Sequence, residues 1–258
     1  MVRVISFGLL LLVLSGCGAG KFQLSKQEYQ AKVQVLGVLP LLVDRAAPLA
    51  YPQGEAVYDL LTRANVGKYE ELVAQLKKKK GYFDVRGLPD GGDLLTMSLL
   101  SGTQPVDAQG RPYRFAFNQE TITELTQRYV VDALLIVVFS GAQVDENRRS
   151  RNLMESLRTS YTDVLATAAV VGRDGKILWQ LNGADSYQAL PLQYADFDEA
   201  YYNRTNQVQV KNISLAGVER MFVGDPGKKG PPNASKMYAE LFGRISSGIS
   251  PGLLDVLR

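Results

Sequence analysis

The side chains that could carry out chemistry in this chain form a short inventory. The 258 residues include no histidine and a single cysteine, Cys17. Without histidine, neither a Ser-His-Asp or Cys-His nucleophile nor a histidine metal site can form. Ser140 follows the strongest predicted strand, but a Gly-x-Ser-x-Gly frame is absent because position 138 is Val138. Carboxylates, lysines, tyrosines and hydroxyls remain as candidate catalysts, and this composition points away from an enzyme.

Three carboxylates stand close together among aromatic residues. Asp196, Asp198 and Glu199 alternate with or follow Phe197 in the sequence. Paired carboxylates serve as acid and base on glycans, and carboxylate clusters bind calcium, although this spacing matches no calcium loop. Acidic residues beside aromatic ones are also common on an ordinary surface segment. A carboxylate-dependent enzyme acting on cell-wall glycan is therefore kept as an alternative, and we expect no metal site and no catalytic residue.

The first residues have the pattern of an export signal. Arg3 is the only charge before an almost continuous apolar run from Val4 to Leu14, and small residues follow. A short positive region, an apolar core and small residues at a cut site define a secretory signal peptide. A helix that spans a membrane needs roughly 20 apolar residues, so this run is too short to remain as an anchor. We predict that residues 1–16 are a cleaved signal peptide.

Leu14, Ser15, Gly16 and Cys17 resemble the lipobox of bacterial lipoproteins. In that family the cysteine thiol takes a diacylglycerol, and the signal is cut just before it. The resemblance implies that Cys17 becomes the first residue and carries acyl chains such as palmitate, with no other cofactor. A single cysteine at a cleavage site is better explained by covalent modification than by disulfide pairing. The alternative is an ordinary signal peptide with an accidental cysteine.

Two or more acyl chains hold a protein stably on a membrane, whereas one chain binds only marginally. In lipoproteins of Gram-negative cells, an aspartate just after the cysteine marks retention at the inner membrane. Gly18, Ala19 and Gly20 occupy those positions here. The resemblance therefore implies the periplasmic face of the outer membrane, or the cell membrane if the host has only one.

Composition bounds the remaining classes of function. Removal of residues 1–16 leaves 242 residues with 28 basic and 26 acidic side chains, because Arg3 leaves with the signal. A net charge of +2 does not suggest a nucleic-acid partner. A hydrophobic content of 46% is ample for the core of one large domain.

The elements that must position these side chains alternate between strands and helices. Helical periodicity is clearest at residues 68–80, where Tyr69, Leu72, Val73 and Leu76 share one face. The remaining patterns predict strands at 33–43, 82–88, 132–138, 163–171 and 176–181, and helices at 55–64, 119–130 and 235–247. Asn118 is expected to cap the helix at 119–130. The side chains expected to face inward on the last helix are Met237, Tyr238, Leu241, Phe242 and Ile245. We predict an α/β (α+β) fold: a mixed sheet of about five strands with helices packed on it.

The domain boundaries follow from this order. Residues 17–32 are expected to be the lipidated cysteine and a tether, and residues 33–258 a single α/β domain. An insertion is expected at about 185–232, where tyrosines cluster without a clear period. The charged residues 145–158 are expected to be a surface excursion.

Four short motifs in a fixed order carry a resemblance to known envelope proteins. They are Val-Leu-Pro (38–40), Gly-Tyr-Phe-Asp-Val (81–85), Asp-Ala-Leu-Leu-Ile (132–136) and Asp-Gly-Lys-Ile-Leu-Trp (174–179). Their order resembles the α/β domain shared by the curli secretion channel family, the lipoprotein activators of penicillin-binding proteins and the amino-terminal domain of the Tol-system propeller protein. The resemblance covers roughly residues 33–182 and implies a non-catalytic role in envelope assembly or scaffolding. Residues 185–232 depart from it, and no pair of alternating membrane strands is evident.

Aromatic and basic residues suggest where a partner would bind. Tyrosine is enriched at interfaces because it buries a large area and keeps a polar tip. The candidate partner surface consists of Tyr194, Phe197, Tyr201, Tyr202, Arg148, Arg149 and Arg151. The alternatives are that the aromatic residues cover the edge of the core and that the arginines, like Lys77 to Lys80, are solvated. We expect contacts with other envelope proteins, and we keep open a homo-oligomer that forms an outer-membrane secretion complex.

Overall fold

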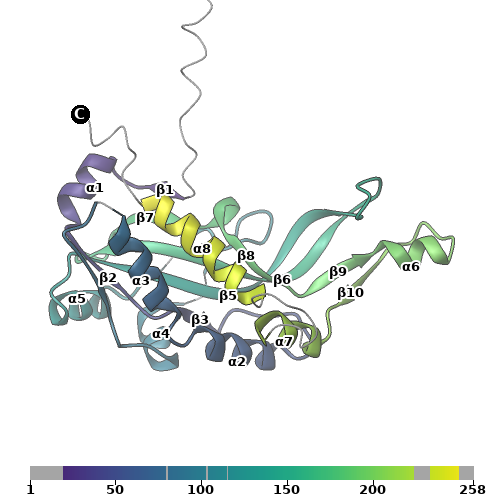
Figure 1. The fold of residues 1–258 in the computed structure, drawn as a ribbon, viewed down its shortest axis with the longest axis horizontal. Helices are drawn as coiled ribbons and strands as arrows, with labels where there is room; N and C mark the ends of the chain where they lie inside the picture. Colours follow the sequence, from purple (N-terminus) through teal and green to yellow (C-terminus); the bar gives the residue numbers. More distant parts are fainter. Residues whose placement is uncertain (1–19, 80, 103, 115, 224–232, 250–258) are drawn as a thin grey trace, which may run out of the picture.

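The computed structural model describes residues 20–79, 81–102, 104–114, 116–223 and 233–249. Within these ranges an eight-stranded mixed sheet lies between helices, which confirms the predicted fold class (Figure 1). Cys17 and the lipobox Leu14, Ser15 and Gly16 lie outside the described residues, so the lipid anchor stays a prediction.

The sheet combines parallel and antiparallel pairing. Its order is β1-β7-β6-β5-β2-β4. β3 pairs with β5 beyond the part that pairs with β2, and β8 pairs with β6 beyond the part that pairs with β7. β2, β3, β4 and β5 pair in parallel, and β6 pairs antiparallel with β5, β7 and β8. The strands are β1 (Lys21–Phe22), β2 (Val35–Val38), β3 (Leu42–Asp44), β4 (Asp84–Gly87), β5 (Ala133–Arg149), β6 (Ser156–Gly172), β7 (Ile177–Leu181) and β8 (Tyr187–Pro191).

Helices cover both faces of the sheet, which explains the continuous apolar run at the start of β5. Leu135 and Val137 point into the larger apolar core, and Leu134 and Ile136 point into the smaller core on the other face. A strand buried on both faces has no polar side to alternate with, so its sequence reads as uninterrupted apolar residues.

The larger core packs against most of the helices. α3 and the long helix α8 lie across this face in Figure 1, and the residues of α8 that were expected inward, such as Tyr238 and Phe242, are buried. Asn118 caps a helix on the smaller core as predicted, accepting the amide of Glu120. The larger core is covered by α1 (Lys26–Lys32), α2 (Gly54–Asn65), α3 (Lys68–Lys78), α7 (Leu215–Val223) and α8 (Asn233–Ile249), and the smaller by α4 (Asp93–Leu99) and α5 (Gln119–Arg128).

The expected tether is wrong from residue 21 onward. Ser25 and Glu28 form a reciprocal capping box that begins α1, and this helix buries Tyr29 against Phe22 with ring centres 5.0 Å apart. The Tyr29 hydroxyl also lies 2.7 Å from that of Tyr82. Two aromatic anchors in a polar segment are enough to fold it onto the body, although they leave no periodic signal in the sequence.

Two other predicted boundaries are corrected. The strand expected at 33–43 is broken into β2 and β3 around Pro40, which has no amide to donate to a ladder. The expected insertion is only partly one, because β8 joins the main sheet and α7 packs on the core. Within the expected insertion, the part that leaves the body is a smaller hairpin, which consists of β9 (Gln193–Asp196), α6 (Phe197–Tyr202) and β10 (Gln209–Asn212). No helix in the described ranges is long and apolar enough to cross a membrane.

Candidate functional site

Residues 145–158, expected to be a surface excursion, do leave the body, and they do so as a regular continuation of two sheet strands joined by a turn. β5 and β6 have 17 residues each and stay paired from Ala133↔Gly172 to Arg149↔Ser156. A strand of this length measures about 55 Å, so its outer part extends beyond the core as the first arm (residues 145–160). Figure 1 shows its tip at the upper right.

The first arm ends in a tight turn with exposed apolar side chains. The Ser150 hydroxyl accepts the Glu155 amide at 3.1 Å, and the Asn152 side chain accepts the Met154 amide at 3.0 Å. Leu153, with a φ of +61°, and Met154 are 68% and 85% exposed. The turn is held by its own polar groups, so these two apolar side chains are free to contact a partner.

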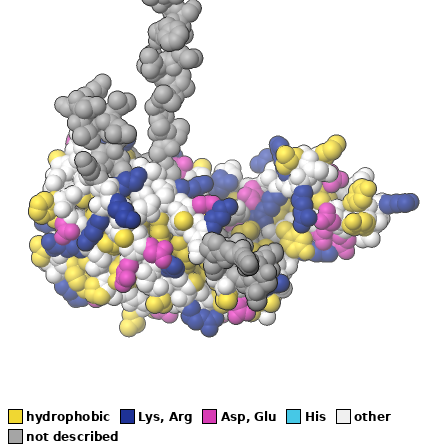
Figure 2. Space-filling view, viewed as in Figure 1, with side chains coloured by type: hydrophobic (Ala, Val, Ile, Leu, Met, Phe, Trp, Pro, Cys, Tyr) yellow, Lys and Arg dark blue, Asp and Glu magenta, His cyan; other side chains and the backbone are white. Residues whose placement is uncertain are grey.

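The second arm is the β9-α6-β10 hairpin (residues 193–212), which leaves the body at the same end (Figure 1). Phe197 is buried and supports α6, whereas Tyr201 and Tyr202 are 76% and 81% exposed. Their rings meet edge to face with centres 5.7 Å apart. In Figure 2 both arms carry apolar side chains beside charged ones.

A buried ion pair braces the bases of the two arms. Arg148 donates two hydrogen bonds to Asp163, at 2.8 and 2.7 Å, and a third to the carbonyl of Gln193 on β9. Asp163 is fully buried, and the Arg148 guanidinium lies 3.9 Å from the ring centre of Tyr161. This cluster joins β5, β6 and β9, so the direction of the second arm is tied to the first.

The electrostatics of this joint follow from burial and charge. Burial raises the pKa of Asp163 above its usual value, although the hydrogen bonds and charge of Arg148 act in the opposite direction. Burial alone would lower the pKa of Arg148, but hydrogen bonding to Asp163 and the charges of Asp163 and Glu146 raise it. Arg148 and Asp163 therefore stabilise each other's charge, since removing either side chain would leave the charge of the other buried without a partner.

The structure divides the predicted partner surface between the two arms. Arg148 and Phe197 are wrongly placed there by the sequence, because the guanidinium is neutralised in the joint and the phenyl ring is buried. The exposed members are Tyr194, Tyr201 and Tyr202 on the second arm and Arg149 and Arg151 on the first. Leu153 and Met154 were missed, since two apolar residues in a polar turn give no periodic signal.

Of the three carboxylates considered for catalysis, Asp196 and Glu199 have structural roles on the second arm, and Asp198 lies in the first turn of α6. Asp196 accepts the Glu199 amide at 2.9 Å and so caps α6, and Lys211 binds both Asp196 and Glu199 at 3.0 and 2.5 Å. The Glu199 amide and the Lys211 charge lower the pKa of Asp196. A carboxylate held in its charged form cannot act as the proton donor that glycan hydrolysis requires.

A cavity of about 540 Å³ lies where β3 ends beside β5. Small apolar side chains line most of it, with Asp44, Gln104, Ser140 and Gln143 as polar residues. Burial raises the pKa of Asp44. Neither Asp44 nor Gln104 was identified from the sequence, and Ser140 has no histidine to activate it. The described residues contain no group of three or more acidic, cysteine or histidine side chains that could hold a metal ion.

Comparisons with known proteins give weak similarities. No protein-family model matches the chain, and no curated protein matches its sequence. Two structures of the PelC dodecamer from Paraburkholderia phytofirmans, one of them a variant, are each 8% identical, with TM-scores of 0.31 and 0.32. The matches cover 85% and 91% of this chain and 91% and 95% of those chains.

A neuraminyllactose-binding hemagglutinin homolog from Helicobacter pylori is 10% identical, with a TM-score of 0.37. That match covers 87% of this chain and 86% of the other. Likenesses at this level identify neither a family nor a function. The resemblance to the three envelope groups therefore stays a prediction.

Proposed function

We propose that the chain is a lipid-anchored periplasmic envelope protein that acts without catalysis, as an assembly, accessory or scaffolding factor. The observation that carries this proposal is the pair of braced arms with exposed apolar tips at Leu153, Met154, Tyr201 and Tyr202. Exposed apolar side chains held on rigid supports are typical of protein contact sites. The anchor rests on the signal and lipobox pattern that ends at Cys17.

A carboxylate-dependent glycan enzyme receives no support from the geometry. Asp196 and Glu199 are bound by Lys211, and Asp163 is enclosed by Arg148. None of these carboxylates lines the cavity beside β3 and β5, where Asp44 is the one carboxylate among the described lining residues, whereas glycan hydrolysis requires a pair. The proposal of a non-catalytic role therefore fits the positions of the acidic residues as well as the absence of histidine from the sequence.

A second candidate is a subunit of an oligomeric outer-membrane secretion complex. Both arms leave the same end of the body, and in this assembly we place the arms of one copy against a different surface of its neighbour. Such head-to-tail contacts generate rings when the rotation between copies closes. The partner of the arms would then be a second copy of this chain.

Native mass of the full-length protein, extracted in mild detergent from its own membrane, distinguishes the two candidates. A ring-sized homo-oligomer supports the secretion-complex subunit and refutes the simple accessory factor. A monomer, or a stoichiometric complex with one envelope protein, supports the accessory factor.

Variants then test whether the arms make the contact. Leu153→Ser with Met154→Ser is expected to weaken the assembly about 30-fold, the effect of losing one interface hot spot. The matched control is Leu94→Ser with Met97→Ser, which removes two similarly exposed apolar side chains from α4. An assembly that survives the arm change, or that is equally weakened by the control, would exclude the first arm as the contact.

A further inference from the structure

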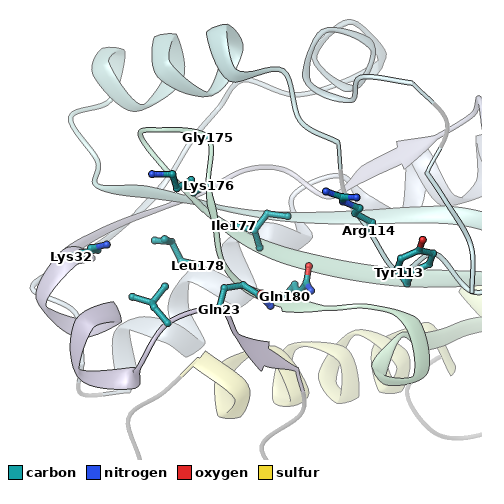
Figure 3. Close-up of a pocket in the computed structure, with 10 residues that line it drawn as sticks. Gln23, Lys32, Tyr113, Arg114, Gly175, Lys176, Ile177, Leu178 and Gln180 are labelled. Carbon is teal, nitrogen blue, oxygen red and sulfur yellow. The ribbon is translucent and has the colours of Figure 1, made fainter.

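A groove of about 790 Å³ lies over β7, beside the point where the described chain begins. Leu24, Ile177 and Leu178 supply its apolar lining, and Gln23, Tyr113 and Gln180 line it as well. Its rim carries Lys32, Arg114 and Lys176 from three separate segments (Figure 3). Among the described residues that line the groove, these three are the charged ones, and all are cationic.

Two carboxylates close in sequence to the rim cations leave this positive charge available. Asp174 pairs with Lys176 at 3.1 Å, but both side chains are exposed, and such surface pairs contribute little. Glu28, one turn before Lys32, accepts the amide and the hydroxyl of Ser25 at 3.0 Å in the capping box. Neither carboxylate lines the groove.

The groove lies next to the proposed lipid attachment. β1 pairs with β7 through Lys21 and Gln180, and the amide of Gln23 donates to the carbonyl of Leu178 at 2.9 Å. Cys17 is three residues before Gly20, so the attached lipid enters within about 11 Å of Gly20 by chain length alone. A membrane that holds the acyl chains is therefore within reach of the groove.

We propose that the groove binds the phosphate headgroup of an anionic phospholipid in the membrane that carries the anchor. The proposal rests on acylation of Cys17. The cations of the rim match a phosphate, the polar side chains of the lining match the glycerol oxygens, and the apolar side chains match the first methylene groups of the lipid. The anchor keeps the groove beside the lipid surface, so even weak headgroup binding is favoured by a high effective concentration. Headgroup binding would orient the body, and thus the arms, relative to the membrane.

The test uses the full-length protein, reconstituted in nanodiscs of phosphatidylcholine containing a phosphatidylglycerol with a photoreactive headgroup. Intact mass first shows whether Cys17 carries its lipid, and peptide mapping then locates the crosslinks. The triple variant Lys32→Gln, Arg114→Gln and Lys176→Gln removes the rim charges. The control removes three exposed lysines from the end of α3, none of which lines the groove: Lys77→Gln, Lys78→Gln and Lys79→Gln.

Crosslinks are expected in the segments that line the groove. The rim variant is expected to lower the yield of these crosslinks at least about fivefold, because even one cation near an anionic surface contributes about that factor to binding. The control variant is expected to give the same yield as the unchanged protein. If the protein is acylated but gives no crosslinks in the groove, the headgroup site is refuted and the lipid anchor is not. An equal loss in both variants also overturns the headgroup site, since net charge would then suffice. Protein without acyl groups overturns the anchor and, with it, this site.

Discussion

Replacement of Arg148 by methionine removes the cation from the joint between the arms while keeping most of its aliphatic length. Asp163 would stay fully buried without its two charge-assisted hydrogen bonds, and the Gln193 carbonyl would lose a donor. Breaking a buried ion pair by removing one partner costs about 3–5 kcal/mol. Natural domains are stable by about 5–15 kcal/mol, so a large part of the free energy of unfolding should be lost.

Urea denaturation followed by fluorescence of Trp179 measures this loss, because the chain has one tryptophan and it is buried in the core. Arg149→Met is the matched control, since the neighbouring arginine on the same strand is exposed. Hydrogen exchange in β9 and β10 reports on the second arm separately. Faster exchange there with unchanged global stability would show that the joint holds the arm alone.

The double variant Arg148→Met with Asp163→Leu completes the cycle. A buried ion pair replaced by apolar residues of similar volume is often as stable as the original, so most of the lost stability should return. The reasoning is refuted if Arg148→Met unfolds within about 1 kcal/mol of the wild type and leaves exchange in the second arm unchanged, since breaking a buried ion pair should cost several times that amount.

Three further changes test local features of the fold. Gly20→Ala should destabilise by about 1–3 kcal/mol in urea denaturation, because its φ is +86° and a Cβ would lie 2.5 Å from the Trp179 ring. Asn118→Ala should cost about 0.5–2 kcal/mol in the same assay, since α5 loses its side-chain cap; an unchanged midpoint would contradict this. The pKa of Asp196 is lowered in the folded arm, so the stability that this carboxylate contributes to the arm is complete above about pH 3.9 and is lost as the pH falls below that value. Hydrogen exchange of α6, corrected for the intrinsic rate, should therefore rise at lower pH. An exchange rate that stays level would contradict a role for the cap.

Local patterns were enough to predict the strands and helices of the core. The apolar run of residues 132–138 predicts the central strand, and Asn118 predicts the start of α5. These predictions succeed because burial on both faces and side-chain capping depend on neighbours a few residues away. The fold of residues 21–32 was missed because Tyr29 is buried, and Phe22 partly buried, by contacts with distant parts of the chain.

The candidate partner surface was also predicted in part from residue type and missed in part because of distant contacts. Tyr201 and Tyr202 were identified as interface residues from their type alone, and they are exposed. Arg148 was placed on the same surface, but its partner Asp163 is 15 residues away and meets it only when β5 and β6 pair in register. No composition or period separates a solvated arginine from one that is enclosed by a distant carboxylate.

The sequence by itself determined the exclusion of histidine chemistry and the α/β class, and it predicts an export signal and a lipid attachment at Cys17. Each of these depends on residue type or on spacing along the chain. Only the tertiary structure decided that two arms leave one end of the sheet, that Arg148 and Asp163 join them, and that Lys32, Arg114 and Lys176 surround one groove. The physical reason is that charges and apolar surfaces act through space, and the pairing of distant strands sets which of them meet.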